Sequence, residues 1–354
     1  MFEQVNGKIV DAAADRVVQP STFRLSNMQR YLHMDMPGEM QAFVDGGKLK
    51  TGYPNVDAIT SLYPGLYVVG AISSLGKTTF IHQMADQIAE AGNPVLFFSL
   101  EQSTLELATK SLSRIMAKEN ASTAMTSLQI RKNGDDPKVA TAVNVYDRYA
   151  NNVLIAECTF RATIETIETT VVNFIKQKER KPVVIIDYLQ VIQAASDTYM
   201  TTKDLVDMHV RRLKQLQSDN KLVLIVISSL NRQNYLTQID FESFKESGGI
   251  EYTADVVWGL QLEAIHNEIF DKQAKLNEKR QVIKEAKAAN PRRIELVCLK
   301  NRFGISSYSC MFDYFPQFDY FRPDMSRFDE AAVEGDKDGF TRIPDGYDIP
   351  FDQS

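Results

Sequence analysis

Residues 66–79 read LYVVGAISSLGKTT, an apolar run followed by a short loop that ends in Gly-Lys-Thr. The loop has the spacing of a phosphate-binding loop, G-x-x-x-x-G-K-S/T, with Ala71 in the place of the first glycine. The apolar run predicts a strand, and apolar residues at helical spacing predict a helix over residues 78–89. Because the motif binds phosphates in this strand–loop–helix context, the stretch predicts a nucleotide-binding α/β core. The alternative is a chance Gly-Lys-Thr at a strand–helix turn.

The residues of this loop have separate roles toward nucleotide phosphates and Mg²⁺. Gly76 lets the backbone approach the phosphates, Lys77 supplies a positive charge for the outer phosphates, and Thr78 supplies a hydroxyl for Mg²⁺. The backbone N–H groups of the loop and the N-terminus of the next helix attract phosphate as well. The residues that we expect to hold the nucleotide in this segment are Ala71, Ser73, Ser74, Gly76, Lys77, Thr78 and Thr79.

Two other predicted strands end in carboxylates. VVIIDY (183–188) ends in Asp187, which we expect to hold Mg²⁺ at the carboxyl edge of a parallel sheet; the alternative is a strand-end cap. No acid follows Asp187 directly, since Tyr188 does. LFFSLE (96–101) therefore supplies the candidate general base or water-orienting group, Glu101. A charge that favours the N-terminus of the following helix is the alternative for Glu101, and the residues alone leave both readings open.

Strands and helices are predicted to alternate along the rest of the chain. This alternation predicts an α/β fold with a mostly parallel sheet and helices on both faces. Continuous β-branched runs at 183–186 and 222–227 are typical of central strands that are buried on both faces. Further strands are predicted at 95–100, 153–156, 255–260 and 294–299, and helices at 104–118, 164–178 and 205–217.

Three segments are predicted along the chain. Residues 1–50 are expected to be a tail and a linker or docking helix, and residues 51–321 the ATPase domain. Residues 263–290, rich in Lys and Glu, are expected to form an inserted helical hairpin, with a partner-binding arm as the alternative. Residues 322–354 are expected to be an acidic disordered tail, since residues 324–354 contain nine acidic and three basic residues.

The composition excludes several classes of protein. The 354 residues carry a formal net charge of -6, which argues against nucleic-acid binding by bulk positive charge but allows a basic channel. Cys158, Cys298 and Cys310 are too scattered for a disulfide framework or a zinc site, and free thiols suit the reducing cytosol. No apolar run is long enough to span a membrane. We therefore expect a cytoplasmic protein without a membrane partner.

Seven stretches, in this order, resemble the RecA-like motor domain of replicative DNA helicases of the DnaB type. The phosphate loop of that family also has alanine first, and the resemblance covers about residues 50–321. It implies a RecA-like P-loop NTPase fold. The stretches are TGYPNVDAI (51–59), AISSLGKT (71–78), FFSLEQS (97–103), IIDYLQVI (185–192), ISSLNRQ (227–233), ESGGIEYTADVV (246–257) and KNRFG (300–304).

The resemblance implies catalytic roles for residues on two subunits. Lys77 and Glu101 act on the ATP that their own chain holds, whereas Lys300 and Arg302 reach the γ-phosphate of ATP held by the neighbouring subunit. A solvated strand end is the alternative for this second pair. Ser229 stands at the sensor position, where the family usually has glutamine. A serine hydroxyl is shorter, so its reach to the γ-phosphate is in question.

The resemblance also implies a central channel for single-stranded DNA. Lys245, Glu246 and Gly248 match channel-loop positions that touch the DNA backbone, and Arg232 lies in the same segment. Contacts to phosphates would be independent of sequence and sensitive to salt. The alternative for Lys245 is an ordinary surface lysine.

The implied function is an ATP-driven DNA helicase motor that forms a ring, expected to be a hexamer, and translocates on single-stranded DNA during replication. Primase or a helicase loader is the implied protein partner. The family's helical N-terminal collar is absent, and residues 1–50 are too short to replace it. A phage or mobile-element form and the helicase part of a longer primase–helicase both stay open. The rival functions are a RecA-like recombination or repair ATPase and a nucleotide-gated adaptor, but the intact catalytic set favours an active hydrolase.

Overall fold

A computed structural model describes most of the chain as two units, Met1–Asp45 and Gly46–Ser354. The first unit contains a three-stranded antiparallel sheet of β1 (Phe2–Val5), β2 (Lys8–Asp11) and β3 (Arg16–Val18). The helical segment that follows consists of α1 (Met28–Arg30), a π-helical turn (Tyr31–Asp35) and α2 (Met36–Gly46). The described residues are 2–5, 8–11, 16–18, 27–158, 162–193, 201–231, 237–244, 248–265 and 276–326.

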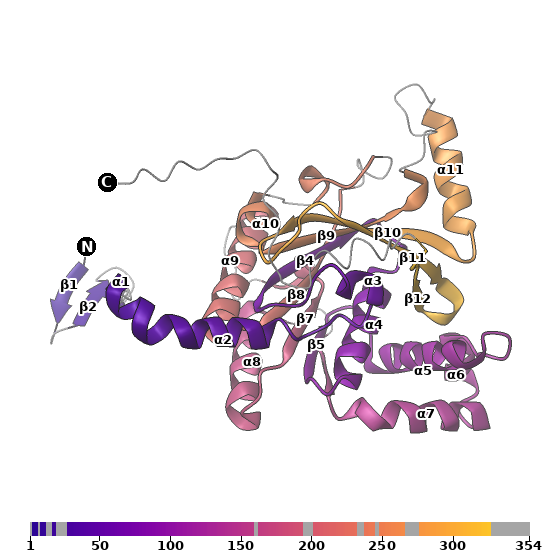
Figure 1. The fold of residues 1–354 in the computed structure, drawn as a ribbon, viewed down its shortest axis with the longest axis horizontal. Helices are drawn as coiled ribbons and strands as arrows, with labels where there is room; N and C mark the ends of the chain where they lie inside the picture. The colour runs from indigo at the N-terminus through magenta and orange to yellow at the C-terminus, as the bar shows by residue number, and fades with distance from the viewer. Residues whose placement is uncertain are drawn as a thin grey trace, which may run out of the picture. The chain divides into compact units, whose positions relative to one another are not determined.

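The second unit is built on a nine-stranded sheet (Figure 1). Its strands are β4 (Gly65–Ala71), β5 (Val95–Ser99), β6 (Val153–Glu157), β7 (Val183–Asp187), β8 (Val223–Ser229), β9 (Val256–Leu262), β10 (Arg292–Asn301), β11 (Ser309–Phe315) and β12 (Tyr320–Pro323). They lie in the order β12-β11-β10-β9-β4-β8-β7-β5-β6. The six strands from β9 to β6 pair in parallel, and β10, β11 and β12 add an antiparallel extension.

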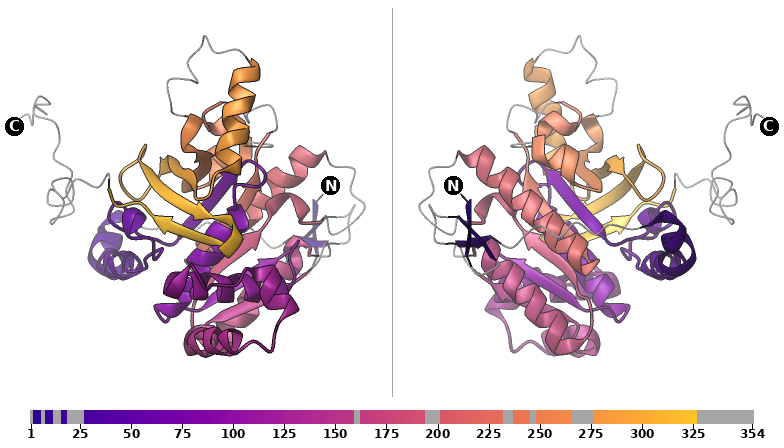
Figure 2. Two further views of the ribbon diagram at one scale, coloured as in Figure 1. Left: turned by 90° about the vertical axis from the view of Figure 1, so that its right-hand side faces the viewer. Right: turned by 90° about the vertical axis from the view of Figure 1, so that its left-hand side faces the viewer.

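Helices cover both faces of this sheet, which confirms the predicted fold class. Figure 2 shows α8 (Ile164–Lys178) and α9 (Thr202–Asn220) on one side of the sheet and α5 (Thr104–Asn120) and α7 (Pro137–Ala150) on the other. The other helices of the unit are α3 (Pro54–Asp57), α4 (Lys77–Glu90), α6 (Ser127–Lys132), α10 (Gly248–Thr253) and α11 (Leu276–Ala288). Short 3₁₀ turns occupy Leu189–Val191, Phe241–Ser243, Glu263–Ile265 and Pro316–Phe318.

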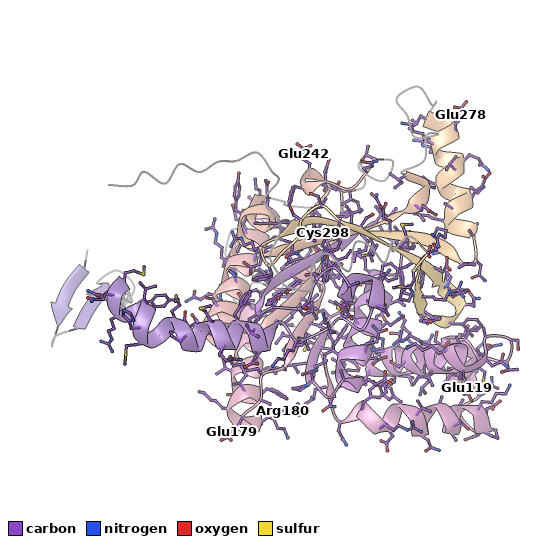
Figure 3. All side chains as sticks on the ribbon, viewed as in Figure 1. Glu119, Glu179, Arg180, Glu242, Glu278 and Cys298 are labelled. Carbon is purple, nitrogen blue, oxygen red and sulfur yellow. The ribbon has the colours of Figure 1, made fainter. Side chains whose placement is uncertain are left out.

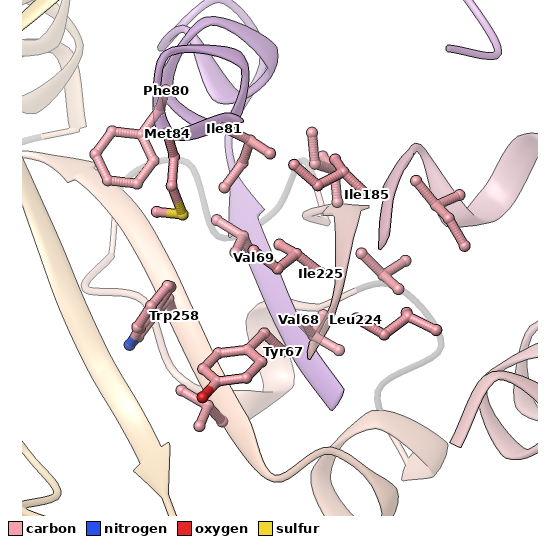
Figure 4. Packing of buried hydrophobic residues seen from close by; sticks show 14 of the residues in the cluster. Tyr67, Val68, Val69, Phe80, Ile81, Met84, Ile185, Leu224, Ile225 and Trp258 are labelled. Atoms are coloured by element: carbon pink, nitrogen blue, oxygen red, sulfur yellow. The ribbon is translucent and has the colours of Figure 1, made fainter. Parts of the chain in front are cut away.

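The core forms where β-branched strands meet the phosphate-loop helix. Every residue of β4 is buried, and α4 packs Phe80 and Ile81 onto the sheet (Figure 4). Tyr67 and Trp258 lie on neighbouring strands with ring centroids 5.4 Å apart. Burial of each large apolar side chain stabilises the fold by about 1.5–3 kcal/mol, so this packing holds β4 and its loop in place.

Several charged side chains lie at the ends of helices, and all three cysteines are free. Figure 3 shows Glu119, Glu179 and Glu278 at the outer ends of helices, whereas Cys298 lies in the sheet. Within the described ranges, no helix is both long and apolar enough to cross a bilayer.

The elements differ from the sequence-based expectations in several places. Strands β1 to β3, β11 and β12 were not predicted, and neither was helix α10. Strand β12 ends at Pro323, two residues beyond the expected domain end, and Asp324 then binds Arg293. Within 263–290 the structure describes one 3₁₀ turn and one long helix, α11, while residues 266–275 lie outside the described part. The expected tail from residue 327 onward lies outside it as well.

Candidate nucleotide-binding site

The loop between β4 and α4 has the backbone shape of a phosphate cradle. Ser74 and Gly76 both have positive φ, 68° and 85°, which turns the chain tightly before the helix begins. A Cβ at Gly76 would lie 2.8 Å from Cζ of Tyr314, so space as well as conformation requires glycine there. Lys77 donates a hydrogen bond from Nζ to the Ala71 carbonyl at 3.1 Å, which folds its ammonium group back over the loop.

A cavity of about 410 Å³ opens above this loop and gathers most of the predicted nucleotide-binding residues. Ala71 is the exception: it is fully buried at the end of β4 and contributes its carbonyl to Lys77. The cavity is lined by Ser73, Ser74, Gly76, Lys77, Thr78, Thr79, Glu101, Gln102, Lys110, Asp187, Tyr188, Ser229, Tyr314 and Asp319.

Asp187 and Thr78 fit a magnesium ion. Asp187 is 2% exposed at the end of β7, and it lines the cavity together with Thr78. Burial raises the pKa of Asp187 to about 6; the Thr78 and Lys77 side chains oppose this shift and Glu101 adds to it. A buried carboxylate of this kind is stabilised by a cation, and Mg²⁺ favours such oxygen ligands together with phosphate oxygens and water. No set of three or more His, Cys, Asp or Glu ligands occurs among the described residues, so this shell does not resemble an all-protein cage.

Glu101 lies at the rim of the cavity, in the short turn between β5 and α5. The N-terminus of α5 is capped by Ser103 and Glu106, which bond each other's backbone N–H groups, so the helix does not depend on Glu101. The Leu100 N–H donates to the Asp187 carbonyl at 2.9 Å and ties the ends of the two strands together. Burial raises the pKa of the Tyr188 phenol, and the nearby Glu101 carboxylate adds to this shift.

Three contacts with the cavity or its loop come from the antiparallel extension. Sequence reasoning missed these contacts. Arg292 donates from Nη1 to the Ser74 carbonyl at 2.9 Å, and the Tyr314 ring lies beneath Gly76. Asp319 accepts a hydrogen bond from the Thr79 hydroxyl at 3.2 Å and lies 3.6 Å from the Lys110 ammonium group. The phosphate loop is therefore shaped partly by residues more than 200 positions away in the chain.

The end of β8 is bonded to a glutamine in the turn that follows β7. The Ser229 N–H donates to Oε1 of Gln190 at 3.2 Å, and Nε2 of Gln190 donates to the Ser228 hydroxyl at 2.9 Å. Ser229 lines the cavity, as predicted. Gln190 thus joins the turn after β7 to the end of β8.

The structure places Lys300 and Arg302 away from the cavity of their own chain. Asn301, the neighbour of Arg302, lies opposite Val256, and Val256 lies opposite Tyr67 near the start of β4; Lys300 lies one step further along, opposite Val257. The phosphate loop begins after Ala71, at the other end of β4. At about 3.3 Å per residue, Asn301 is about 13 Å and Lys300 about 10 Å from the level of Ala71 along the strand direction. These two cations therefore do not reach the nucleotide cavity within one chain.

Of the candidate DNA contacts, only Gly248 lies in the described part, where it begins α10. Arg232, Lys245 and Glu246 lie outside the described residues. Their roles stay predictions.

A family model described as "DnaB-like helicase C terminal domain" matches residues 48–322. The chain belongs to this family. The "Replicative DNA helicase DnaB" of Buchnera aphidicola is 26% identical over 230 residues, which cover 63% of this chain and 48% of that protein. The chain spans about half the length of the curated relatives that it matches first.

Solved structures show the same fold for this DnaB-like domain. One solved ATPase domain has a TM-score of 0.65 and 18% identity, covering 84% of this chain and 99% of that one. "The Structure Of A DnaB-Like Replicative Helicase And Its Interactions With Primase" has a TM-score of 0.64 and 18% identity, covering 86% and 68%. These likenesses confirm the predicted RecA-like P-loop fold.

Proposed function

We propose that the chain is the motor of a replicative DNA helicase, which hydrolyses ATP at subunit interfaces and translocates on single-stranded DNA. One observation carries this proposal: the phosphate loop and the two cations Lys300 and Arg302 lie at opposite ends of the sheet. Assembly into a ring accounts for this arrangement, because one subunit's cations then face the next subunit's phosphate loop. Family membership supports the same conclusion.

Six residues of the cavity and two cations of the next subunit have proposed roles in hydrolysis. Lys77 and the loop N–H groups bind the outer phosphates of ATP, and Thr78 and Asp187 hold Mg²⁺, which offsets phosphate charge when it is bound. Glu101 accepts the proton of the attacking water or orients that water, and the nearby Tyr188 phenol helps to position the carboxylate. Arg302 and Lys300 of the next subunit neutralise charge that develops on the γ-phosphate. Ser229 lines the cavity at the sensor position, where its shorter side chain stands in place of the family's usual glutamine.

The proposed partners are single-stranded DNA, further copies of this chain in a ring taken to be a hexamer, and primase or a helicase loader. The segment 232–248 is proposed to contact DNA phosphates through Arg232, Lys245, Glu246 and Gly248. A solved DnaB-like helicase that is described with its interactions with primase supports the choice of protein partner. Because contacts to phosphates dominate, binding should weaken steeply with salt.

The deciding experiment combines strand displacement on forked DNA with mass measurement in the presence and absence of ATP. A helicase motor will displace the strand and form a closed oligomer. ATP hydrolysis that single-stranded DNA stimulates without strand displacement would indicate a recombination-type or repair ATPase. Turnover that DNA leaves unchanged would indicate a nucleotide-gated adaptor.

A further inference from the structure

Asp255 is a buried carboxylate that links four parts of the fold at the edge opposite the nucleotide cavity. It lies two residues after the end of α10 and is 4% exposed. Its Oδ2 accepts hydrogen bonds from the Leu66 N–H at 2.8 Å and from Nζ of Lys214 at 2.5 Å. Its Oδ1 accepts one from Nη1 of Arg302 at 3.2 Å. This acid is the one described carboxylate that pairs with the guanidinium proposed to act on the neighbouring subunit.

The backbone around Arg302 is held independently of that carboxylate. The Arg302 N–H donates to the Asp255 carbonyl at 3.0 Å, a bond that does not use the side chain. The next residue, Phe303, packs on Tyr63 with ring centroids 5.4 Å apart and fills the space beside Gly65. The main chain thus fixes where Arg302 begins, and the Asp255 carboxylate fixes where its guanidinium points.

Arg302 is held loosely enough to act on a second partner. Its side chain is 51% exposed, and only one guanidinium nitrogen bonds Asp255 among the described residues. When the guanidinium turns to a phosphate, Lys214 and the Leu66 N–H stay on the carboxylate. Asp255 therefore keeps two partners, which avoids the cost of an isolated buried charge.

Helix α10, which precedes Asp255, binds the second cation, Lys300. Lys300 donates from Nζ to the Glu251 carbonyl at 2.6 Å, within α10. Helix α10 is fixed on α9 at two points, through Asp207 to the Gly249 N–H at 3.0 Å and through Lys214 to Asp255. Both cations are thus bonded to one segment, residues 249–255, which is attached to α9 at both ends.

We propose that Asp255 is a positioning residue for catalysis in trans: it orients the Arg302 guanidinium toward the neighbouring subunit, and Lys214 balances its charge when Arg302 leaves. The proposal rests on the function proposed above, in which Arg302 acts on the next subunit's ATP. Asp255 belongs to the half of the site that donates the cations, and it plays no part in holding nucleotide in its own chain.

The test is Asp255→Asn, which keeps an acceptor for the Leu66 N–H but removes the charge that orients Arg302. We expect kcat of DNA-stimulated ATP hydrolysis to fall at least tenfold while KM for ATP changes less than twofold. Asp255→Glu should restore part of kcat. Glu168→Gln, which removes the charge of a carboxylate paired with Arg212 elsewhere on α9, is the matched control and should keep kcat within twofold.

Mixed assemblies separate positioning from a merely structural effect. Asp255→Asn protein mixed with Lys77→Ala protein should regain activity, because an intact cation-donating half meets an intact phosphate loop. Mixed with Arg302→Ala protein it should regain none, since both variants damage the same half. Rescue by Arg302→Ala protein, or no rescue by Lys77→Ala protein, would overturn the proposal. If Arg302→Ala and Lys77→Ala proteins fail to rescue each other, the shared site itself fails, which is a separate result.

A second variant covers the case in which Asp255→Asn does not fold. Lys214→Met removes the half-buried partner of Asp255 and leaves the carboxylate dependent on Arg302 alone. Release of Arg302 then leaves a buried charge with less compensation, so kcat should fall with an unchanged KM for ATP. The same pattern of rescue is expected in mixtures. An unchanged kcat in a folded Lys214→Met protein would contradict the role given to Lys214.

Discussion

Lys77 and Arg302 of one chain lie at opposite ends of strand β4. Lys77 bonds the Ala71 carbonyl at the carboxyl end of the strand, and Arg302 bonds Asp255 beside Leu66 at its amino end. The site proposed above, in which Arg302 acts on ATP, therefore needs two chains. This relationship decides how the first prediction is designed.

Arg302→Ala and Lys77→Ala should each abolish turnover, and the mixture should recover part of it. An arginine acting in trans contributes about a thousandfold or more to phosphoryl transfer, so the single variants should fall by that factor. Steady-state ATP hydrolysis at a fixed total protein concentration measures the recovery. The Arg322→Ala variant, which loses an exposed arginine bound to Asp313, is the control and should behave like the unaltered chain. Turnover by isolated protomers that is independent of dilution would contradict the two-chain site.

Glu101→Gln should keep nucleotide binding and lose hydrolysis. The amide has the shape of the carboxylate but cannot accept the proton of water, and general-base catalysis contributes about a hundredfold or more. A fluorescent ATP analogue measures binding, and phosphate release measures hydrolysis. Glu106→Gln removes a charge one turn away that caps α5, and should leave hydrolysis nearly unchanged. Full activity of Glu101→Gln would remove Glu101 from its proposed role.

Arg292→Lys should weaken nucleotide binding. The lysine keeps the positive charge but loses the planar donor that bonds the Ser74 carbonyl at 2.9 Å, so the loop is held less firmly. A hydrogen bond of this kind is worth about 1 kcal/mol, which corresponds to roughly a fivefold increase in Kd for ATP. Equilibrium titration checks the value. The prediction is wrong if Kd stays within the error of the unaltered protein.

Acidification should destabilise the fold through His82 and His209. Burial lowers the pKa of each imidazole to about 4, whereas an unfolded chain has the ordinary value near 6.5. The unfolded state therefore binds more protons between these values. The contribution of the neutral histidines to the free energy of unfolding is fully present above about pH 6.5 and is lost as the pH falls toward 4.

Urea unfolding of the unaltered chain and of His209→Leu, measured from pH 7 to pH 4.5, checks this dependence. His209 is 1% exposed, and neither ring nitrogen has a partner in the described part of the chain. The leucine variant should therefore show a shallower loss of unfolding free energy as the pH falls. Equal slopes for both proteins would refute the contribution of His209.

The buried pair Asp86 and Arg114 gives a further stability prediction. Arg114→Met leaves the Asp86 carboxylate without its guanidinium partner, and loss of one member of a buried ion pair costs about 3–5 kcal/mol. The double variant Asp86→Leu/Arg114→Met should recover much of this loss, because it leaves no buried charge. Urea unfolding measures both. A double variant less stable than Arg114→Met would show that the pair contributes more than charge compensation.

Local pattern predicted the parallel half of the sheet well, since β7 and β8 are rich in β-branched residues and β4 contains a continuous apolar run. Strands β11 and β12 were not predicted, because SCMFDYF and YFRP mix charged and aromatic residues without a clear period. The phosphate loop and Asp187 were placed correctly by motif and strand end. Contacts such as that of Thr79 with Asp319 were not, because they join residues 240 positions apart through strands that no local pattern indicates.

The same long-range contacts set the order of events during synthesis. Arg292, Tyr314 and Asp319 support the phosphate loop from the last described strands of the chain. A ribosome makes residues 71–79 long before these supports exist. A nascent chain should thus bind nucleotide weakly until translation has passed Pro323, so incomplete chains should hydrolyse little ATP.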